Sequence, residues 1–132
     1  MRRILAVDDS TTVLVSIELA LKKRGYALDL FQRPGPALES ISRAVPDLVI
    51  TDLNMPEMTG IELIRRVRQL PPPARFVPIV VLTTEGRQAK KEEARKAGAT
   101  VWITKPFTPE GLEGVVRRLA AATNNYTIID YN

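Results

Sequence analysis

Short runs of β-forming apolar residues alternate with longer stretches of helical periodicity along this chain, and the alternation constrains the fold more than any other feature. The expected strands are 3–7 (RILAV), 26–31 (YALDLF), 47–51 (DLVIT), 77–82 (VPIVVL) and 100–103 (TVWI). The expected helices are 11–24, 35–44, 60–70, 87–97 and 109–121. Each connection is long enough for a right-handed crossover, and no hairpin signal interrupts the order. The pattern predicts a doubly wound α/β fold, with a parallel sheet between two layers of helices.

Turn-forming residues lie where this arrangement needs them. Gly25 and Gly98 follow expected helices, Pro71 opens a Pro-Pro-Pro stop, and Thr108-Pro109 provides an N-cap with proline at the first helical position. A length of 132 residues suits a single core. We therefore expect one domain over 1–122 and a C-terminal tail over 123–132, in which the β-leaning piece YTIID has no predicted place.

Composition removes several kinds of chemistry. The sequence has no cysteine and no histidine, which excludes disulfides, thiolate nucleophiles, imidazole bases and the usual zinc sites. Apolar runs reach only four residues, as in 4–7 and 79–82, so we expect no membrane association and a cytoplasmic protein. The formal charge of +4 is spread over several expected helices, and direct DNA binding by this domain is therefore disfavoured.

Polar side chains follow four of the five expected strands. Asp8 and Asp9 come after the first, Asp52 ends the third, Thr83 follows the fourth and Lys105 the fifth. Ligands of an open parallel sheet bind beyond the carboxyl ends of its strands. Three acids, a hydroxyl and an amine are thus predicted to converge on one edge.

Three adjacent carboxylates need a compensating charge, since two of them about 4 Å apart repel by roughly 4 kcal/mol at an effective dielectric constant near 20. A hard divalent cation, Mg²⁺ or Mn²⁺, would supply it, and Lys105 would balance the remaining charge. The same groups suit phosphoryl transfer to a carboxylate. Asp52 is the natural nucleophile because it lies between the other groups.

Four motifs in this order, VDDS, LVITDLNMPEMTG, LTTEG and TKPF, give the chain a clear family resemblance. It resembles the CheY-like receiver domain of two-component response regulators over residues 3 to about 121. The resemblance implies a flavodoxin-like sheet of five strands in the order 2-1-3-4-5 with five helices. It also implies a signalling switch that catalyses only its own phosphorylation and dephosphorylation.

The resemblance assigns roles to the acids. Asp52 corresponds to the phosphoaccepting aspartate, Asp9 to the direct Mg²⁺ ligand, and Asp8 to an acid that acts on the metal mainly through water. Asp52 itself and the backbone carbonyl of Asn54 complete the implied metal site. Asn54 together with Glu85 resembles the combination in chemotaxis receivers, which points to quick resetting.

The remaining roles concern the fourth and fifth strands. Thr83 corresponds to the switch hydroxyl, with Thr84 as the alternative; we expect the other of the two to cap the next helix. Lys105 corresponds to the lysine that pairs with the phosphoryl group, and the resemblance implies a cis bond before Pro106. Trp102 stands where many receivers have Tyr or Phe. Because indole is bulkier than phenol, we expect Trp102 to remain outward, or to be a packed strand residue without a switching role.

The resemblance implies partners as well. The phosphoryl donor would be a phosphohistidine on a separate histidine kinase or histidine phosphotransfer protein, since this chain has no histidine. Phosphorylation would alter the surface of helix 87–97, strand 100–103 and helix 109–121, which would bind a downstream protein or a second copy. Alternatively, the chain is the receiver part of a longer DNA-binding regulator, and nucleic acid would then be bound only by the missing output domain.

Two enzyme classes fit less well. An aspartyl-phosphatase-like hydrolase would carry its nucleophile after the first strand with a second acid two places on, whereas Asp8 and Asp9 are adjacent. A nucleotide enzyme would need a phosphate-binding glycine loop, and neither GxGxxG nor GxxxxGK[ST] occurs in the sequence.

Overall fold

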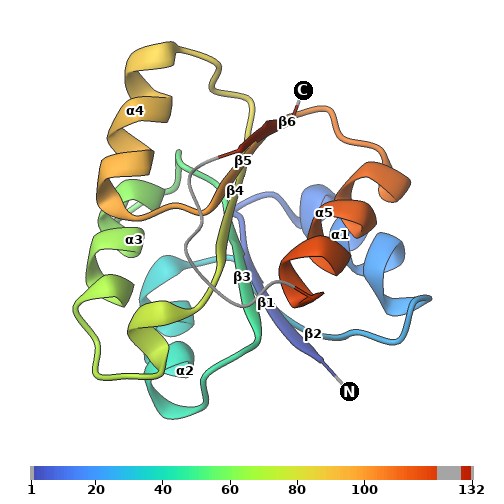
Figure 1. Cartoon of the computed structure of the whole chain (residues 1–132), viewed down its shortest axis with the longest axis horizontal. Coiled ribbons are helices and arrows are strands. Elements are labelled where there is room, and N and C mark those ends of the chain that lie inside the picture. Colours follow the sequence, from blue (N-terminus) through green and yellow to red (C-terminus); the bar gives the residue numbers. More distant parts are fainter. Residues whose placement is uncertain (1, 122–128, 132) are drawn as a thin grey trace.

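The computed structural model describes residues 2–121 and 129–131, and it shows one parallel sheet with helices on both faces (Figure 1). The strands are β1 (Arg3–Val7), β2 (Ala27–Phe31), β3 (Leu48–Thr51), β4 (Ile79–Thr83), β5 (Val101–Thr104) and β6 (Ile129–Tyr131). The helices are α1 (Thr11–Lys22), α2 (Pro34–Arg43), α3 (Gly60–Arg68), α4 (Gln88–Ala97) and α5 (Pro109–Ala121), with a short 3₁₀ turn η1 (Ala74–Phe76). Their order and type confirm the doubly wound α/β prediction.

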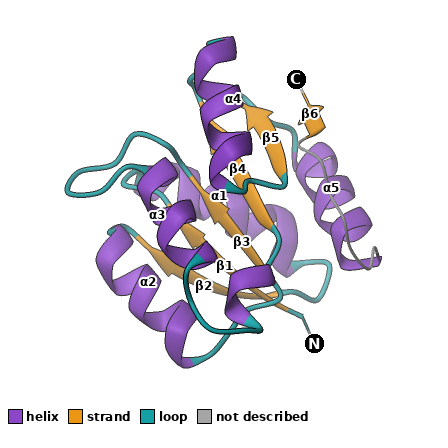
Figure 2. Cartoon of the chain, turned by 60° about the vertical axis from the view of Figure 1, so that its left-hand side comes forward, coloured by secondary structure: helices purple, strands orange, loops and turns teal. Residues whose placement is uncertain are grey.

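Two apolar clusters hold the helices to the sheet, because strand side chains alternate between its faces. Leu5, Val49 and Val81 contribute to the cluster that includes residues of α2, α3 and α4. Their strand neighbours Ile4 and Ile50 contribute to the opposite cluster, with residues of α1 and α5. Figures 1 and 2 show the same division, with α2, α3 and α4 on one face and α1 and α5 on the other.

Local capping residues mark the helix ends, and Thr108 and Gly98 among them were predicted. Ser10 and Thr59 accept hydrogen bonds from backbone N–H groups of the first turns of α1 and α3, and Thr108 does the same for Gly111 at the start of α5. Gly98 ends α4 with a positive φ of 114°, a conformation that glycine adopts without steric cost. The observed bounds differ from the predicted ones by at most two residues, and η1 in the proline-rich loop was not predicted.

The sheet order is β2-β1-β3-β4-β5-β6, so the predicted order of the first five strands is correct and a sixth strand is added beside β5. Strand β6 lies within the stretch predicted to be a tail without a place in the fold. It pairs in parallel with β5, with Trp102 opposite Asp130 in the register. Sequence periodicity missed it because three residues are too few to show a period. The rest of the predicted tail, 123–128 and 132, lies outside the described residues.

None of the helices within the described residues is long and apolar enough to span a bilayer.

Candidate functional site

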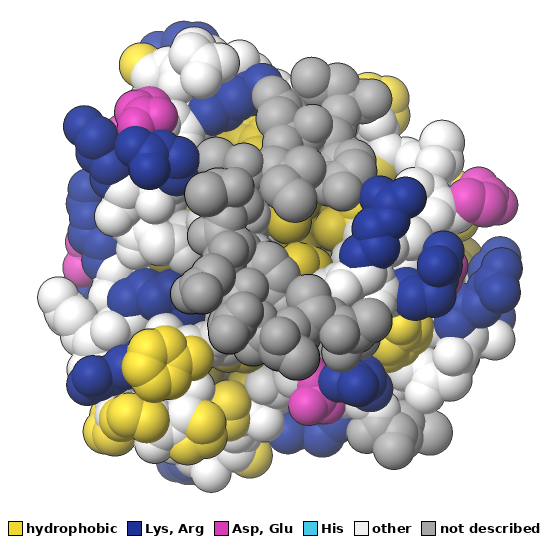
Figure 3. All heavy atoms as spheres, viewed as in Figure 1, with side chains coloured by type: hydrophobic (Ala, Val, Ile, Leu, Met, Phe, Trp, Pro, Cys, Tyr) yellow, Lys and Arg dark blue, Asp and Glu magenta, His cyan; other side chains and the backbone are white. Residues whose placement is uncertain are grey.

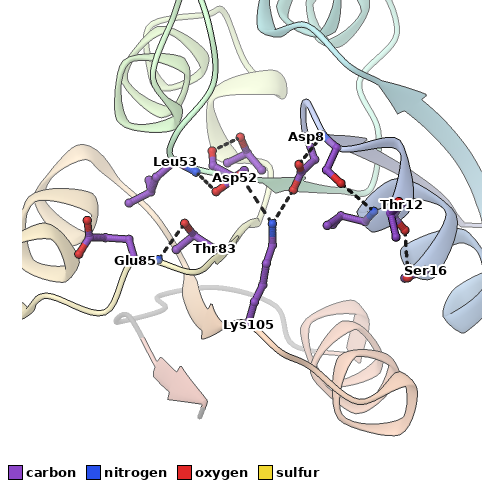
Figure 4. A network of polar contacts seen from close by, with 11 residues as sticks. Asp8, Thr12, Ser16, Asp52, Leu53, Thr83, Glu85 and Lys105 are labelled. Atoms are coloured by element: carbon purple, nitrogen blue, oxygen red, sulfur yellow. Dashed lines mark hydrogen bonds and ion pairs between the residues drawn. The ribbon is translucent and has the colours of Figure 1, made fainter.

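The strand register brings the predicted site residues together at the carboxyl edge of the sheet (Figure 4). Val7 of β1 is opposite Thr51 of β3, so the next residues, Asp8 and Asp52, lie side by side. In the same way, β4 and β5 are paired up to Thr83 and Thr104, which places the residue after β5 at this edge. Residues up to 97 positions apart therefore meet because parallel strands end together.

Asp8, Asp9 and Asp52 form one carboxylate cluster. One oxygen from each lies within 4.8 Å of the others. Asp8 and Asp52 are only 2% and 8% exposed, whereas Asp9 is exposed. The backbone N–H of Ser10 donates to Asp8 Oδ1 at 2.9 Å, and that of Leu53 donates to Asp52 Oδ1 at 2.7 Å. These bonds orient both buried carboxylates from their own loops.

Lys105 reaches into this cluster from the end of β5. Its Nζ lies 2.9 Å from Asp8 Oδ2 and 3.6 Å from Asp52 Oδ2. Its backbone N–H donates to the Thr83 carbonyl at 2.8 Å, which extends the β4–β5 pairing by one residue. The bond from Lys105 to Pro106 is cis, and so is that between Pro72 and Pro73. The Lys105 ammonium thus pairs with two of the three carboxylates, Asp8 and Asp52.

Burial raises the pKa of Asp8 above its ordinary value, because desolvation penalises the charged carboxylate. Hydrogen bonds from Lys105 and from the Ser10 N–H oppose this shift, and the neighbouring Asp52 charge adds to it. The folded protein therefore bears an electrostatic cost at this residue that an added cation would reduce.

The donor set fits a magnesium ion. Mg²⁺ prefers oxygen ligands, usually takes one or two carboxylates and keeps several waters. The cluster offers three carboxylates with an exposed member, and Lys105 leaves a surplus of negative charge. Asp9 is open to solvent and Asp8 is held by Lys105 and Ser10, which agrees with Asp9 as the direct ligand. Asn54 lies exposed in the loop two residues after Asp52.

Thr83 is completely buried, and its hydroxyl accepts a hydrogen bond of 3.3 Å from the Glu85 N–H. Thr84 is exposed. The expectation that one of these threonines caps the next helix is wrong: α4 begins only at Gln88, and its N-cap residue, Arg87, makes no side-chain cap. The turn after β4 has the predicted length but lies one residue later than predicted.

Trp102 is buried, with no exposed surface, so the prediction that its indole remains outward is wrong. It belongs to the apolar cluster on the face of α2, α3 and α4, and its Nε1 donates to Thr104 Oγ1 at 3.1 Å. The same cluster contains the small residues Ala94 and Ala99. Strand periodicity alone does not reveal that residues of α2, α3 and α4 cover this face and bury the ring.

Two residues with structural roles, Gly60 beside the site and Arg68 at the far end of α3, were not singled out from the sequence. Gly60 lies so close to the loop after β3 that a Cβ there would be 2.1 Å from the Asp52 carbonyl oxygen. Arg68 donates to the carbonyls of Gly98, Val77 and Arg75 across the end of α3, and burial lowers its pKa. The sequence does hold a signal for Gly60, which is a glycine that follows turn-forming residues. It holds no signal for Arg68, which is one of several charged residues in its helix.

Comparison with known proteins connects this geometry to one family. A family model described as the response regulator receiver domain matches residues 4–117. The chemotaxis protein CheY1 of Helicobacter pylori is 41% identical over 115 residues, which cover 84% of this chain and 90% of that protein. The phosphate regulon transcriptional regulatory protein PhoB of Rhizobium meliloti is 34% identical over 121 residues, 91% of this chain but 53% of its own length.

A solved structure with the same architecture has metal at its site. The receiver domain of the sensor histidine kinase PA1611 of Pseudomonas aeruginosa is described with a magnesium ion coordinated in its active site cleft. It is 28% identical, superposes with a TM-score of 0.84, and the match covers 92% of this chain and 98% of that one.

Proposed function

This chain belongs to the family of response regulator receiver domains, the CheY-like modules of two-component systems, and from that premise we propose that it is a switch controlled by phosphorylation of Asp52. The observation that carries the proposal is the position of Asp52, buried beside two further carboxylates and with Oδ2 3.6 Å from the Lys105 ammonium.

The proposed reaction uses this arrangement directly. An Asp52 carboxylate oxygen forms the bond to phosphorus, the bond from phosphorus to the imidazole nitrogen of the donor breaks, and the imidazole leaves. The donor would be a phosphohistidine of a kinase or phosphotransfer protein, since these 132 residues contain no histidine of their own. Lys105 neutralises charge on the phosphoryl oxygens. Asp9, Asp8, Asp52 and the Asn54 carbonyl would hold a magnesium ion, which would supply further positive charge.

We propose that Thr83 and Lys105 report the modification. The Thr83 hydroxyl already engages the loop after β4 through Glu85, so its movement toward a phosphoryl group would release that N–H. Trp102 lies on the strand that leads to Lys105, which makes the indole a reporter of changes in β5. Hydrolysis of the phosphoaspartate resets the switch, as water attacks phosphorus and Asp52 leaves as the carboxylate.

The proposed output surface is formed by α4, β5 and α5. Helix α4 has four basic and two acidic side chains in the sequence QAKKEEARKA. Figure 3 shows Lys and Arg side chains gathered over this helix. Ion pairs hold both of its acids, Glu92 with Arg95 and Glu93 with Lys90 and Arg65. A downstream protein with an acidic patch, or a second copy that presents its own acids, suits this surface.

A second candidate is the receiver part of a longer transcriptional regulator. It is favoured by one observation: the match to PhoB covers about half of that protein. The switch at Asp52 is common to both candidates, and the output domain alone differs.

Incubation with a small phosphodonor, acetyl phosphate, and Mg²⁺ tests the switch. We expect one phosphoryl group per chain by mass spectrometry, and none on the Asp52→Asn variant. Lys105→Met should lower the extent of phosphorylation. Thr83→Ala should be phosphorylated normally but fail to give the change in Trp102 emission that accompanies modification. Equal phosphorylation of the Asp52→Asn variant would contradict the proposal.

A further inference from the structure

Strand β6 covers the edge of the sheet on which the proposed output surface is built. Ile129, Asp130 and Tyr131 pair in parallel with Val101, Trp102 and Ile103 of β5. The other side of β5 pairs with β4. Both sides of β5 are therefore occupied, and the chain's own C-terminal segment takes the side that faces away from β4 (Figure 2).

An uncovered edge strand presents a row of unpaired N–H and C=O groups to any strand that approaches it. With β6 in place, the groups of β5 are paired and the free edge of the sheet has moved outward by one strand spacing. A partner that contacts β5 between α4 and α5 would meet β6 first. The segment and the partner cannot use the same backbone groups at the same time.

We propose that Ile129–Tyr131 is an intramolecular competitor for the β5 edge, which must leave before a protein can bind across α4, β5 and α5. The inference rests on the proposed function only in taking that surface as the output surface. The occupant is a segment of this chain, so its occupancy and its release can be measured without a partner.

The pairing is suited to release. β6 has three residues, against four or five in each of the other strands, and its extensive contacts are with β5 alone. The core strands β1, β3 and β4 are each paired on both sides. Opening β6 breaks one short ladder and leaves the rest of the sheet intact, as expected for a segment of low local stability.

Cysteine pairing tests whether the strand occupies this register, and the chain suits the method because it contains no cysteine. Ile103 and Tyr131 are register partners, and neighbouring strands lie about 4.8 Å apart, within the Cα range of a disulfide. The Ile103→Cys/Tyr131→Cys chain should therefore oxidise readily. The matched control, Val101→Cys/Tyr131→Cys, is offset by two residues, which places the Cα atoms about 8 Å apart and outside that range. Equal or absent crosslinking in the two chains would overturn the proposal.

Hydrogen exchange tests whether the strand can leave alone. Consecutive N–H groups of a strand point to opposite sides, so only one of Ile129→Pro and Asp130→Pro removes a donor to β5, and the other is its control. We expect one variant to accelerate exchange at β5 amides at least tenfold without affecting β1 and β3. No acceleration in either variant, or equal acceleration throughout the sheet, would show that β6 is not an independent cover.

Binding of beryllofluoride with Mg²⁺, followed by fluorine NMR, separates this inference from the proposed function. We expect the oxidised Ile103→Cys/Tyr131→Cys chain to bind beryllofluoride, because the disulfide between β5 and β6 does not replace Asp52 or Lys105. An unmodified chain that fails to bind beryllofluoride contradicts the switch at Asp52, while the crosslinking result still decides the position of β6.

Discussion

Asp9 is the carboxylate of the cluster whose charge is least compensated without a metal. Asp8 and Asp52 both face the Lys105 ammonium, at 2.9 Å and 3.6 Å. None of the ion pairs found among the described residues involves Asp9, although its oxygen lies within 4.8 Å of the other two acids. We therefore expect Asp9→Asn to increase the free energy of unfolding of the metal-free protein.

The size of this increase follows from the separation. Two unit charges 4.8 Å apart repel by about 0.9 kcal/mol in water and by about 3.5 kcal/mol at an effective dielectric constant of 20. Asp9 is exposed, so the lower figure applies to each of its two neighbours. Attraction to Lys105, lost in the variant, offsets part of the gain. A net increase of about 1 kcal/mol remains, which raises the melting temperature by roughly 4 °C in a domain of this size.

Mg²⁺ should reverse the order of stability. At about 100 times its dissociation constant, a ligand that binds only the folded state adds roughly 2.7 kcal/mol to the free energy of unfolding. We expect Mg²⁺ to have this effect on the unmodified chain and to have little of it on Asp9→Asn. Urea unfolding at pH 7, with and without Mg²⁺, measures both effects. Glu18→Gln removes a charge of the same sign two helical turns along α1 and is the control. An Asp9→Asn variant that is less stable without metal, or that keeps the full Mg²⁺ gain, would refute the reasoning.

Three further predictions concern Asp8, Arg68 and Gly60. Because burial raises the pKa of Asp8, its contribution to metal-free stability should fall as pH rises from the ordinary carboxyl value of 3.8 through the raised pKa. The difference in unfolding free energy between the unmodified chain and Asp8→Asn separates this contribution from that of carboxyls with a lowered pKa, such as Glu85. Mg²⁺ affinity should rise over the same interval, and titrations that show neither trend would contradict the assignment. Arg68→Met leaves three backbone carbonyls without their arginine donor, so we expect it to lower the free energy of unfolding in urea by about 2–3 kcal/mol. The surface control Arg66→Met should lower it by less than about 0.5 kcal/mol, and equal losses in the two variants would refute a special role for Arg68. Gly60→Ala brings a methyl group to within 2.1 Å of the Asp52 carbonyl oxygen, so we expect the free energy of unfolding to fall by about 2–3 kcal/mol and the reaction with acetyl phosphate to slow. If neither quantity changes, the loop after β3 accommodates the methyl group and the prediction is wrong.

The strands and helices whose apolar residues recur at regular spacing were predictable from the sequence. The first five strands and the five helices have apolar spacings that extend over several residues, and the site follows from them because parallel strands end at one edge. The position of Asp8 beside Asp52 needed no side-chain information, only the register of β1 and β3.

Features that depend on contacts with residues far away in the sequence were not predictable. Arg68 has the sequence context of a solvated helix residue, and its role depends on carbonyls that lie up to 30 positions away. The burial of Trp102 depends on the apolar cluster with residues of α2, α3 and α4, which its own strand does not reveal. Strand β6 has no period of its own, and it forms only because β5 offers an edge.

Strand β5 is where these features meet. Lys105 follows it into the acid cluster, Trp102 fixes its middle in the core, and β6 pairs along its outer side. If Lys105 moves toward a phosphoryl group, the strain passes into β5, whose pairing with β4 is longer than its pairing with β6. The shorter ladder is the easier one to break. A phosphoryl group on Asp52 should therefore loosen β6 before it disturbs the core, and hydrogen exchange of the beryllofluoride-bound chain should show faster exchange in β5 and β6 but not in β4.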